Sequence, residues 1–343
     1  MENEELDDLR VFGLNQTGLR KTLINYDEFH FEEKELVSIE DCFEYKNKPS
    51  ITWINIDGLY ETELVEKLGR YFDLHPLTLE DISSSDQRPK VEDFTNYIFI
   101  ILKMLYFDGE TNKTVSEQLC IVVTQNILIT FQEKPGDIFD LIRNKLKNNK
   151  GRIRKMASDY LAYSLIDAIV DNYFVILEKI GEKIDFLEEE LITNPTQNTL
   201  IDIYELKREV LYLLKSVWPL RTILTNLEKE GSPIINDSTR IFFKDVYDHT
   251  IQVIDSIEQY RESLAEMLNI YVSSLGNKTN TVMKILTIFA TVLMPLNVIT
   301  GFYGMNFEFM PGLHNHWGFF GVVVLMVIAS TGMLYLFKKK NWI

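Results

Sequence analysis

Polar residues recur along one side of a segment that has no proline for 61 residues, between Pro233 and Pro295. Alternate steps of three and four residues, which stay on one face of a helix, connect ten of them and one glycine. They are Asp245, Asp248, Gln252, Asp255, Gln259, Glu262, Glu266, Asn269, Ser273, Gly276 and Asn280. An acidic face of this kind attracts cations and does not suit nucleic acid. The chemistry that these residues favour is therefore the attraction of positive ions.

The same spacing continues into an uncharged part of the chain, at Met283, Thr287, Ala290, Met294, Asn297 and Gly301. The alternative interpretation of the polar part is the solvent side of an amphipathic helix. Its other side carries Val246, Val253, Ile257, Tyr260, Leu264, Met267 and Tyr271. Polar groups at membrane depth are costly unless they face a helix partner or a water-filled path. Because one chain with two spans cannot enclose such a path, several copies must assemble around an axis.

Two uncharged apolar stretches, residues 285–303 and 317–337, make up most of the C-terminal region. A 20-residue helix covers about 30 Å, the thickness of a bilayer's hydrocarbon core, so we expect a transmembrane hairpin. A helix pair in a soluble core is the alternative, but 21 consecutive uncharged residues exceed an ordinary core helix. The run Lys338 to Lys340 follows the second stretch, and the connection has no lysine or arginine. Since such residues are retained on the cytoplasmic side, both chain ends are predicted to be cytoplasmic.

The sequence before Lys278 is strongly acidic, with 30 basic against 50 acidic residues, and the whole chain has a formal net charge of −16. Its first residues, MENEELDDLR, lack the apolar segment of a cleaved signal. Cys42 and Cys120 stand alone, so we expect both to be core thiols in a reducing compartment.

The predicted fold class is α+β, with an N-terminal α/β domain, a long helical stalk and the hairpin. Strand-like runs cover residues 51–56, 97–107 and 119–131, the last broken at 125–126, and helical segments lie near 61–72 and 137–148. Two long helices are expected at 158–191 and 196–228, hinged at Asn194-Pro195. The predicted segments are 1–157 (α/β domain), 158–235 (helix pair), 236–284 (stalk helix), 285–303 (first span), 304–316 (outer loop), 317–337 (second span) and 338–343 (basic tail).

The tetrapeptide Tyr303-Gly304-Met305-Asn306 directly follows the first span, and a short loop, a second span and a lysine-rich tail come after it. In this topology the motif resembles the signature of the CorA family of magnesium and cobalt transport proteins. The stalk sequences at residues 244–250 and 277–280 are also similar to those of the family. The resemblance covers the whole chain.

The resemblance implies a funnel-shaped homopentamer in the plasma (inner) membrane, whose first spans line a central pore and whose second spans face lipid. Gly304, Met305 and Asn306 are then the outer mouth, where hydrated Mg²⁺ is first recognised. Mg²⁺ sheds its water reluctantly, so amide side chains and backbone carbonyls can select it through its hydration shell. We expect Asn306 to face the ion, Gly304 to supply a backbone conformation that a side chain would block, and Met305 to pack.

The predicted pore lining combines spacing with resemblance. Met283 and Met294 form apolar constrictions, and Asn280 and Asn297 form polar rings. The family pattern adds Leu286 to the gate, whereas the spacing favours Thr287. The full set is Asn280, Met283, Leu286, Thr287, Ala290, Met294, Asn297 and Gly301.

By resemblance, a regulatory metal bridges Asp81 of one subunit and Asp245 of the next, and Glu80 is a weaker candidate ligand. Bound Mg²⁺ would cancel carboxylate repulsion and hold the ring closed. Mg²⁺ is therefore both substrate and regulatory ligand, with Co²⁺ and Ni²⁺ as further substrates, and no catalytic cofactor is expected. Two positions depart from the family pattern: Asn269 replaces an acidic residue and Asn297 a threonine.

Three other interpretations stay open. The first is a zinc transporter on the same scaffold, which the Gly-Met-Asn loop does not exclude. The second is a membrane-anchored enzyme, but no nucleophile triad, paired carboxylate or phosphate loop supports catalysis. The third is a scaffold without transport. His314 and His316 form a candidate transition-metal pair, while His30, His75 and His249 are predicted to be structural histidines.

Overall fold

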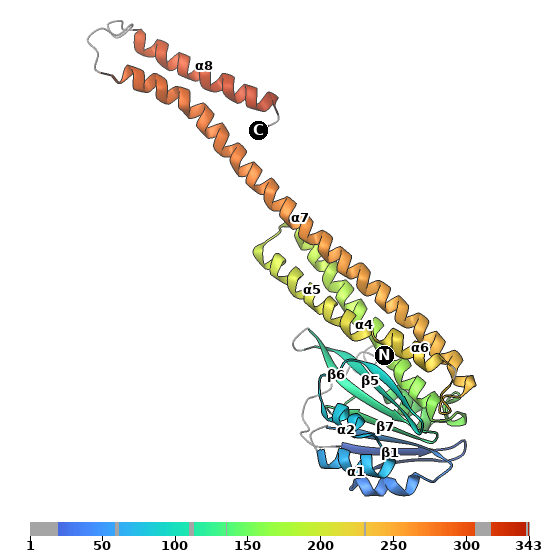
Figure 1. Cartoon of the computed structure of the whole chain (residues 1–343). Helices are drawn as coiled ribbons and strands as arrows, with labels where there is room; N and C mark the ends of the chain where they lie inside the picture. Colours follow the sequence, from blue (N-terminus) through green and yellow to red (C-terminus); the bar gives the residue numbers. More distant parts are fainter. Residues whose placement is uncertain are drawn as a thin grey trace, which may run out of the picture. The chain divides into compact units, whose positions relative to one another are not determined.

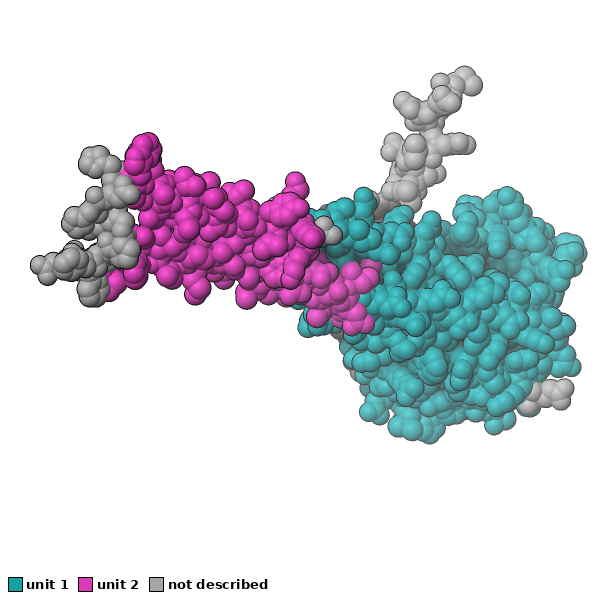
Figure 2. All heavy atoms as spheres, turned by 90° about the horizontal axis from the view of Figure 1, so that it is seen from above, with its two compact units in different colours: residues 1–266 teal, residues 267–343 magenta. Residues whose placement is uncertain are grey.

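The computed structural model of the chain describes residues 20–58, 62–109, 113–134, 136–229, 231–305, 317–340 and 342 (Figure 1). The chain divides into two compact units, residues 1–266 and residues 267–343 (Figure 2).

The first unit is built on a seven-stranded mixed sheet with the order β2-β1-β3-β7-β6-β5-β4. The strands are β1 (Arg20–Tyr26), β2 (Phe31–Glu35), β3 (Ile51–Asp57), β4 (Lys90–Phe94), β5 (Tyr97–Asp108), β6 (Lys113–Val123) and β7 (Ile127–Gln132). Among the described strands only the β3–β7 pair is parallel, and the other neighbours are antiparallel. The runs predicted at 51–56, 97–107 and 119–131 are strands in the structure, the last as the end of β6 followed by β7, and residues 113–118 of β6 were not predicted. The sequence analysis missed β1, β2 and β4, which are short or carry many charges.

One face of the sheet is covered by the short 3₁₀ helix η1 (Ile39–Tyr45) and by α1 (Thr62–Phe72) and α2 (Pro76–Ser83). Inward-facing strand residues such as Ile54 and Phe131 form one apolar cluster with Leu68 of α1. Cys42 and Cys120 lie in this cluster as free, fully buried thiols, as predicted. The space between this face of the sheet and the three helices is therefore filled by a hydrophobic core.

The other face of the sheet is covered by α4 (Ser158–Thr193), with α3 (Asp140–Lys147) and η2 (Ile153–Lys155) nearby in sequence. The Tyr173 hydroxyl of α4 donates a 2.6 Å hydrogen bond to the Lys103 carbonyl of β5. Trp53 of β3 contacts Phe139 edge to face, and its indole N–H donates to the Thr130 hydroxyl. Polar and aromatic side chains thus hold α4 on the sheet, and they also hold Phe139, the residue just before α3.

The predicted helix at 196–228 is wrong in one respect, because it is two helices: α5 (Gln197–Val217) and α6 (Leu220–Glu228). Pro219 lies between them, and proline lacks the amide hydrogen that a continuous helix requires. The expected helix pair of 158–235 is therefore three helices. The predicted break at Asn194-Pro195 does separate α4 from α5.

Helix α7 (Asp237–Tyr303) contains 67 residues, about 100 Å at 1.5 Å per residue. Its start is held by the fully buried Asp159 of α4, whose carboxylate accepts hydrogen bonds from the backbone and side-chain nitrogens of Asn236 at 2.7 and 3.0 Å. Pro295 lies inside the helix without ending it.

The second unit contains the C-terminal part of α7 and α8 (Gly318–Lys339), and α8 runs back in the direction opposite to that of α7 (Figure 1). Three described helices are long and apolar enough to cross a membrane: α4, α7 and α8. Half of the apolar window of α4 is buried inside the protein, whereas none of the corresponding residues of α7 or α8 is buried. Only α7 and α8 therefore have the surfaces of membrane helices.

Candidate functional site

The eleven positions from Asp245 to Asn280 form a polar stripe along α7, and this stripe lies on the exposed side of the helix. Asp245, Asp255 and Glu266 are all exposed, whereas Val253 and Leu264 on the opposite side are buried. Within the first unit the stripe is thus the water-facing side of an amphipathic helix, as its composition predicts. Its acidic side chains remain available to ions or to another copy of the chain.

Further along α7, the predicted pore-lining residues all lie on an uncovered helix surface. Met283 and Met294 are 54% and 71% exposed, and Asn280 and Asn297 are exposed as well. The hydroxyl of Thr287 donates to the Met283 carbonyl at 2.7 Å, so its hydrogen is used within the helix. Leu286 is 60% exposed. Leu286 and Thr287 are both exposed, so each can face a pore that several copies enclose.

The end of α7 explains why a glycine stands at position 304. The Gly304 amide donates to the Thr300 carbonyl at 2.8 Å, and a Cβ atom on Gly304 would lie only 3.0 Å from that same oxygen. A larger residue would therefore crowd the helix end. Met305 is half-exposed. The predictions for Asn306, for the loop to residue 316 and for the pair His314 and His316 lie outside the described residues.

Asp81, the first predicted regulatory ligand, belongs to α2 and is paired within the chain. Its carboxylate lies 2.7 Å from the Lys90 ammonium, and its side chain is 13% exposed. The backbone carbonyl of Asp81 accepts a hydrogen bond from the buried Gln118 side chain at 3.2 Å. Glu80 is exposed. Asp81 is thus a fixed carboxylate that already has a cationic partner.

Asp245, the second predicted ligand, lies near an acidic group that the sequence analysis missed. Asp167, Asp171 and His249 each offer a ligand atom, and these atoms lie within 4.8 Å of one another. Burial and then the Asp171 charge raise the pKa of Asp167, and Asp245 adds to this, while His249 and Tyr163 oppose it. A carboxylate whose pKa is raised in this way is stabilised by a bound proton or a bound cation.

The prediction that His249 is a satisfied structural histidine is wrong. Its Nδ1 atom is buried and has no hydrogen-bond partner among the described residues, and the ring lies beside two carboxylates. The signal that could have found this group is a pair of four-residue spacings: Asp167 and Asp171 on α4, and Asp245 and His249 on α7. By contrast, His75 is structural, because its Nδ1 caps α2 by accepting from the Leu77 amide.

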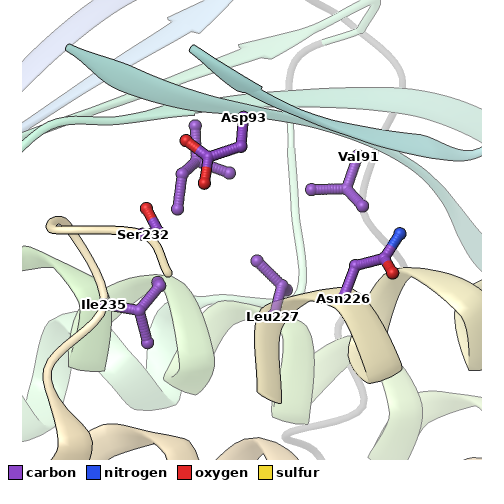
Figure 3. Close-up of a pocket in the computed structure, with 7 residues that line it drawn as sticks. Val91, Asp93, Asn226, Leu227, Ser232 and Ile235 are labelled. Atoms are coloured by element: carbon purple, nitrogen blue, oxygen red, sulfur yellow. The ribbon is translucent and has the colours of Figure 1, made fainter. Parts of the chain in front are cut away.

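A small pocket of about 240 Å³ lies between β4, β5 and the region around α6 (Figure 3). Its lining residues are Val91, Asp93, Ile98, Asn226, Leu227, Ser232 and Ile235. Asp93 is the one titratable side chain among these residues, and no histidine, cysteine or lysine accompanies it and Ser232 in the lining. The pocket therefore gives no support to an enzymatic interpretation.

Comparison with known proteins assigns the architecture. The model of the family described as "CorA-like Mg2+ transporter protein" matches residues 48–339. The cobalt/magnesium transport protein CorA of Thermotoga maritima is 46% identical over 321 residues, which cover 94% of this chain and 92% of that protein. The complete structure of the CorA magnesium transporter from Methanocaldococcus jannaschii has a TM-score of 0.78 at 26% identity, over 96% of this chain and 100% of that chain.

A more distant structure shares the fold alone. The cytoplasmic domain of ZntB from Vibrio parahaemolyticus has a TM-score of 0.58 at 14% identity, over 75% of this chain and 98% of that chain. The mixed-sheet domain, the long helix and the apolar C-terminal helices confirm the predicted fold class. A match over most of the length to one family, and 46% identity to a member, show that this chain belongs to the CorA-like family of Mg²⁺ transporter proteins.

Proposed function

We propose that several copies of this chain form a channel that conducts Mg²⁺, and also Co²⁺ and Ni²⁺, through the plasma (inner) membrane down the electrochemical gradient. The assembly is a homopentamer with a funnel shape, and both ends of each chain are cytoplasmic. The α7 helices line the pore, α8 faces lipid, and the protein is a transporter without catalytic activity.

The observation that carries the proposal is the polar stripe of α7, which continues from a water-facing acidic surface into a segment with no buried residue. Exposed apolar side chains of this kind need lipid or other protein around them. The amide of Asn297 needs water or partners at that depth, and the amide of Asn280 lies just before the span. A ring of α7 helices with the stripe inside satisfies both requirements.

Selection takes place at the outer mouth, where Gly304, Met305 and Asn306 from each copy surround hydrated Mg²⁺. The amide oxygens of Asn306 accept hydrogen bonds from the ion's water shell, so the ion is recognised before it loses water. Met283 and Met294 provide constrictions that exclude water when the channel is closed.

Gating depends on cytoplasmic Mg²⁺ bound between neighbouring copies, with Asp81 and Asp245 as ligands and Glu80 as a further ligand. Carboxylate oxygens fit this ion, because Mg²⁺ is a hard cation that binds through oxygen. The group of Asp167, Asp171 and His249 on α4 and α7 lies near Asp245. Its two carboxylates add to the negative potential there. Binding reduces repulsion between subunits, and loss of the ion lets them separate.

The test is cation uptake by proteoliposomes that contain the intact chain. We expect Mg²⁺ and Co²⁺ uptake, and we expect Asn306→Ala to lower its initial rate at least about tenfold, the effect of removing one good charge-assisted contact per subunit. Asn315→Ala, in the same connection, is the matched control and keeps the rate.

Two results would contradict the proposal. An intact protein that transports neither Mg²⁺ nor Co²⁺ is not this channel. Uptake of Zn²⁺ without uptake of Mg²⁺ would assign the chain to the zinc-transporter alternative.

A further inference from the structure

Lys90 bridges two carboxylates on the surface of the sheet domain. Its ammonium nitrogen lies 2.7 Å from Asp81 Oδ2 and 2.7 Å from Glu92 Oε1. Asp81 comes from α2, whereas Lys90 and Glu92 both belong to β4, the edge strand of the sheet. One positive charge is therefore shared between a helix and the strand beside it.

The two carboxylates differ in how firmly they are placed. The Asp81 side chain is 13% exposed, and that of Glu92 is 36% exposed. The fully buried Gln118 donates to the carbonyls of Asp81 and Ser84, at 3.2 and 2.7 Å, which holds the end of α2 on the sheet. Asp81 thus stays in position, while Lys90 has a flexible side chain and a second carboxylate on its own strand.

Lys90 remains charged in this position. Burial lowers the pKa of Lys90, but the hydrogen bonds that its ammonium donates to Asp81 and Glu92 outweigh that effect and leave the pKa above its usual value. An ammonium at 2.7 Å occupies an oxygen of Asp81 that a divalent cation would need. It also repels any cation that approaches, since two positive charges a few ångströms apart are unfavourable even near a protein surface.

We propose that Lys90 is an internal competitor for the divalent cation at Asp81. The Lys90 ammonium occupies the carboxylate when no ion is bound, and it stays with Glu92 alone when the ion binds. Lys90 therefore sets the Mg²⁺ concentration at which the regulatory site fills. This inference rests on the proposed function, because it takes Asp81 to be a cation ligand.

Glu92 has a defined part in this exchange, since it gives the displaced ammonium a partner. Removal of Glu92 leaves Lys90 with Asp81 alone, so the cation meets a stronger competitor. Removal of Lys90 eliminates the competition. The two substitutions are therefore expected to shift Mg²⁺ binding in opposite directions. An ion pair that only holds β4 and α2 together would be weakened by either substitution, and both would then shift binding in the same direction.

The experiment is a Mg²⁺ titration of the full chain in detergent, with resistance to limited proteolysis as the readout. We expect Lys90→Met to lower the half-effective Mg²⁺ concentration roughly three- to tenfold, the range for losing a partly exposed charged pair. Glu92→Gln should raise that concentration. Lys179→Met is the matched control, because Lys179 pairs with Glu182 at 3.1 Å on α4, and it should leave the titration unchanged.

A double-mutant cycle separates competition from a general change in charge. If Glu92 acts through Lys90, then Glu92→Gln has little effect once Lys90 is methionine. An equal effect of Glu92→Gln in both backgrounds would overturn the proposal. This comparison holds even if one variant is less stable, since each is measured by its own midpoint.

Asp81→Asn distinguishes failure of this inference from failure of the proposed gating site. If Asp81→Asn weakens the response to Mg²⁺ and Lys90→Met leaves it unchanged, Lys90 is no competitor and the gating site stands. If neither variant changes the response, Asp81 is not a cation ligand, and both proposals are wrong at that residue.

Discussion

The sheet domain and the C-terminal helices are both rich in apolar residues, but they place them differently. In the domain, Trp53, Phe99 and Phe131 are almost completely buried within one chain. In α8 no described residue is buried, and Val324, Leu325 and Ile328 are each more than half exposed. The first region can satisfy its apolar side chains in water by itself, whereas the second needs lipid or other copies.

The contrast between α4 and α7 makes the same point for two helices of similar composition. Both contain a window apolar enough to cross a membrane. The apolar side of α4 is covered by the sheet, and Asn172 and Tyr173 donate hydrogen bonds to backbone carbonyls of β5. Hydropathy alone therefore does not identify a membrane helix. What covers the helix decides it.

The largest expected effect tests this contrast by removing one phenylalanine from each region. Phe131→Ala in the domain should lower the free energy of unfolding by about 3–5 kcal/mol, because it leaves a cavity in a closed core. Phe289→Ala on α7, where the ring is 62% exposed, should change it by less than about 0.5 kcal/mol. Denaturant unfolding of the purified chain in detergent measures both. Similar losses would mean that the C-terminal helices are packed like the domain.

A second effect concerns pH and belongs to the domain alone, since it depends on a buried carboxyl group. Glu117 of β6 is 2% exposed, and burial raises its pKa to about 7, although the Lys134 amide donates a 2.8 Å hydrogen bond to it. The folded pKa is above the unfolded value of about 4.3, so the folded state binds the proton more tightly. Stability should therefore fall as pH rises from about 4.5 to 7, by roughly 3 kcal/mol for this group.

Glu117→Gln removes this dependence while keeping an oxygen for the Lys134 amide. Unfolding measured at pH 5 and pH 8 should differ less in the variant than in the unchanged chain. A variant with the same pH dependence would show that another group is responsible.

The smallest expected effect sharpens the contrast within the second region. Cysteine at Asn297 should react with a water-soluble thiol reagent at least about tenfold faster than cysteine at Ile299, a difference of about 1.4 kcal/mol in barrier. The two positions are two residues apart and so lie on nearly opposite sides of α7. Cysteine at Asn280 should react as Asn297→Cys does.

The native thiols provide a low background in this labelling. Cys42 and Cys120 are fully buried, and burial raises the pKa of each to about 12. Equal labelling rates for Asn297→Cys and Ile299→Cys would show that the polar stripe does not face water.

The elements with strong local patterns could be predicted from the sequence. The proline-free run predicts α7. The runs of β-branched and aromatic residues predict β3, β5, the end of β6, and β7. The break at Pro219 was missed, although a proline inside a helical pattern is a local signal. The edge strands β2 and β4 were missed because their charged side chains face water on a sheet whose existence depends on distant partners.

The site was predictable only in part, for a similar reason. Asp81 and Asp245 could be named by resemblance, but the pairing of Asp81 with Lys90 depends on how α2 meets β4. The approach of His249 to Asp167 joins residues 82 positions apart in the chain. The four-residue spacings mark one face of α4 and one face of α7, but only the packing of the two helices shows that these faces meet.

Pro295 inside α7 has a consequence for the backbone rather than for side chains. Because proline has no amide hydrogen, the carbonyl of Thr291 loses the donor that would normally come four residues later. An acceptor dipole is thus left without its usual helical partner in the apolar part of α7. In a bilayer such an oxygen needs another donor, which a side chain of a neighbouring helix or a water molecule can supply.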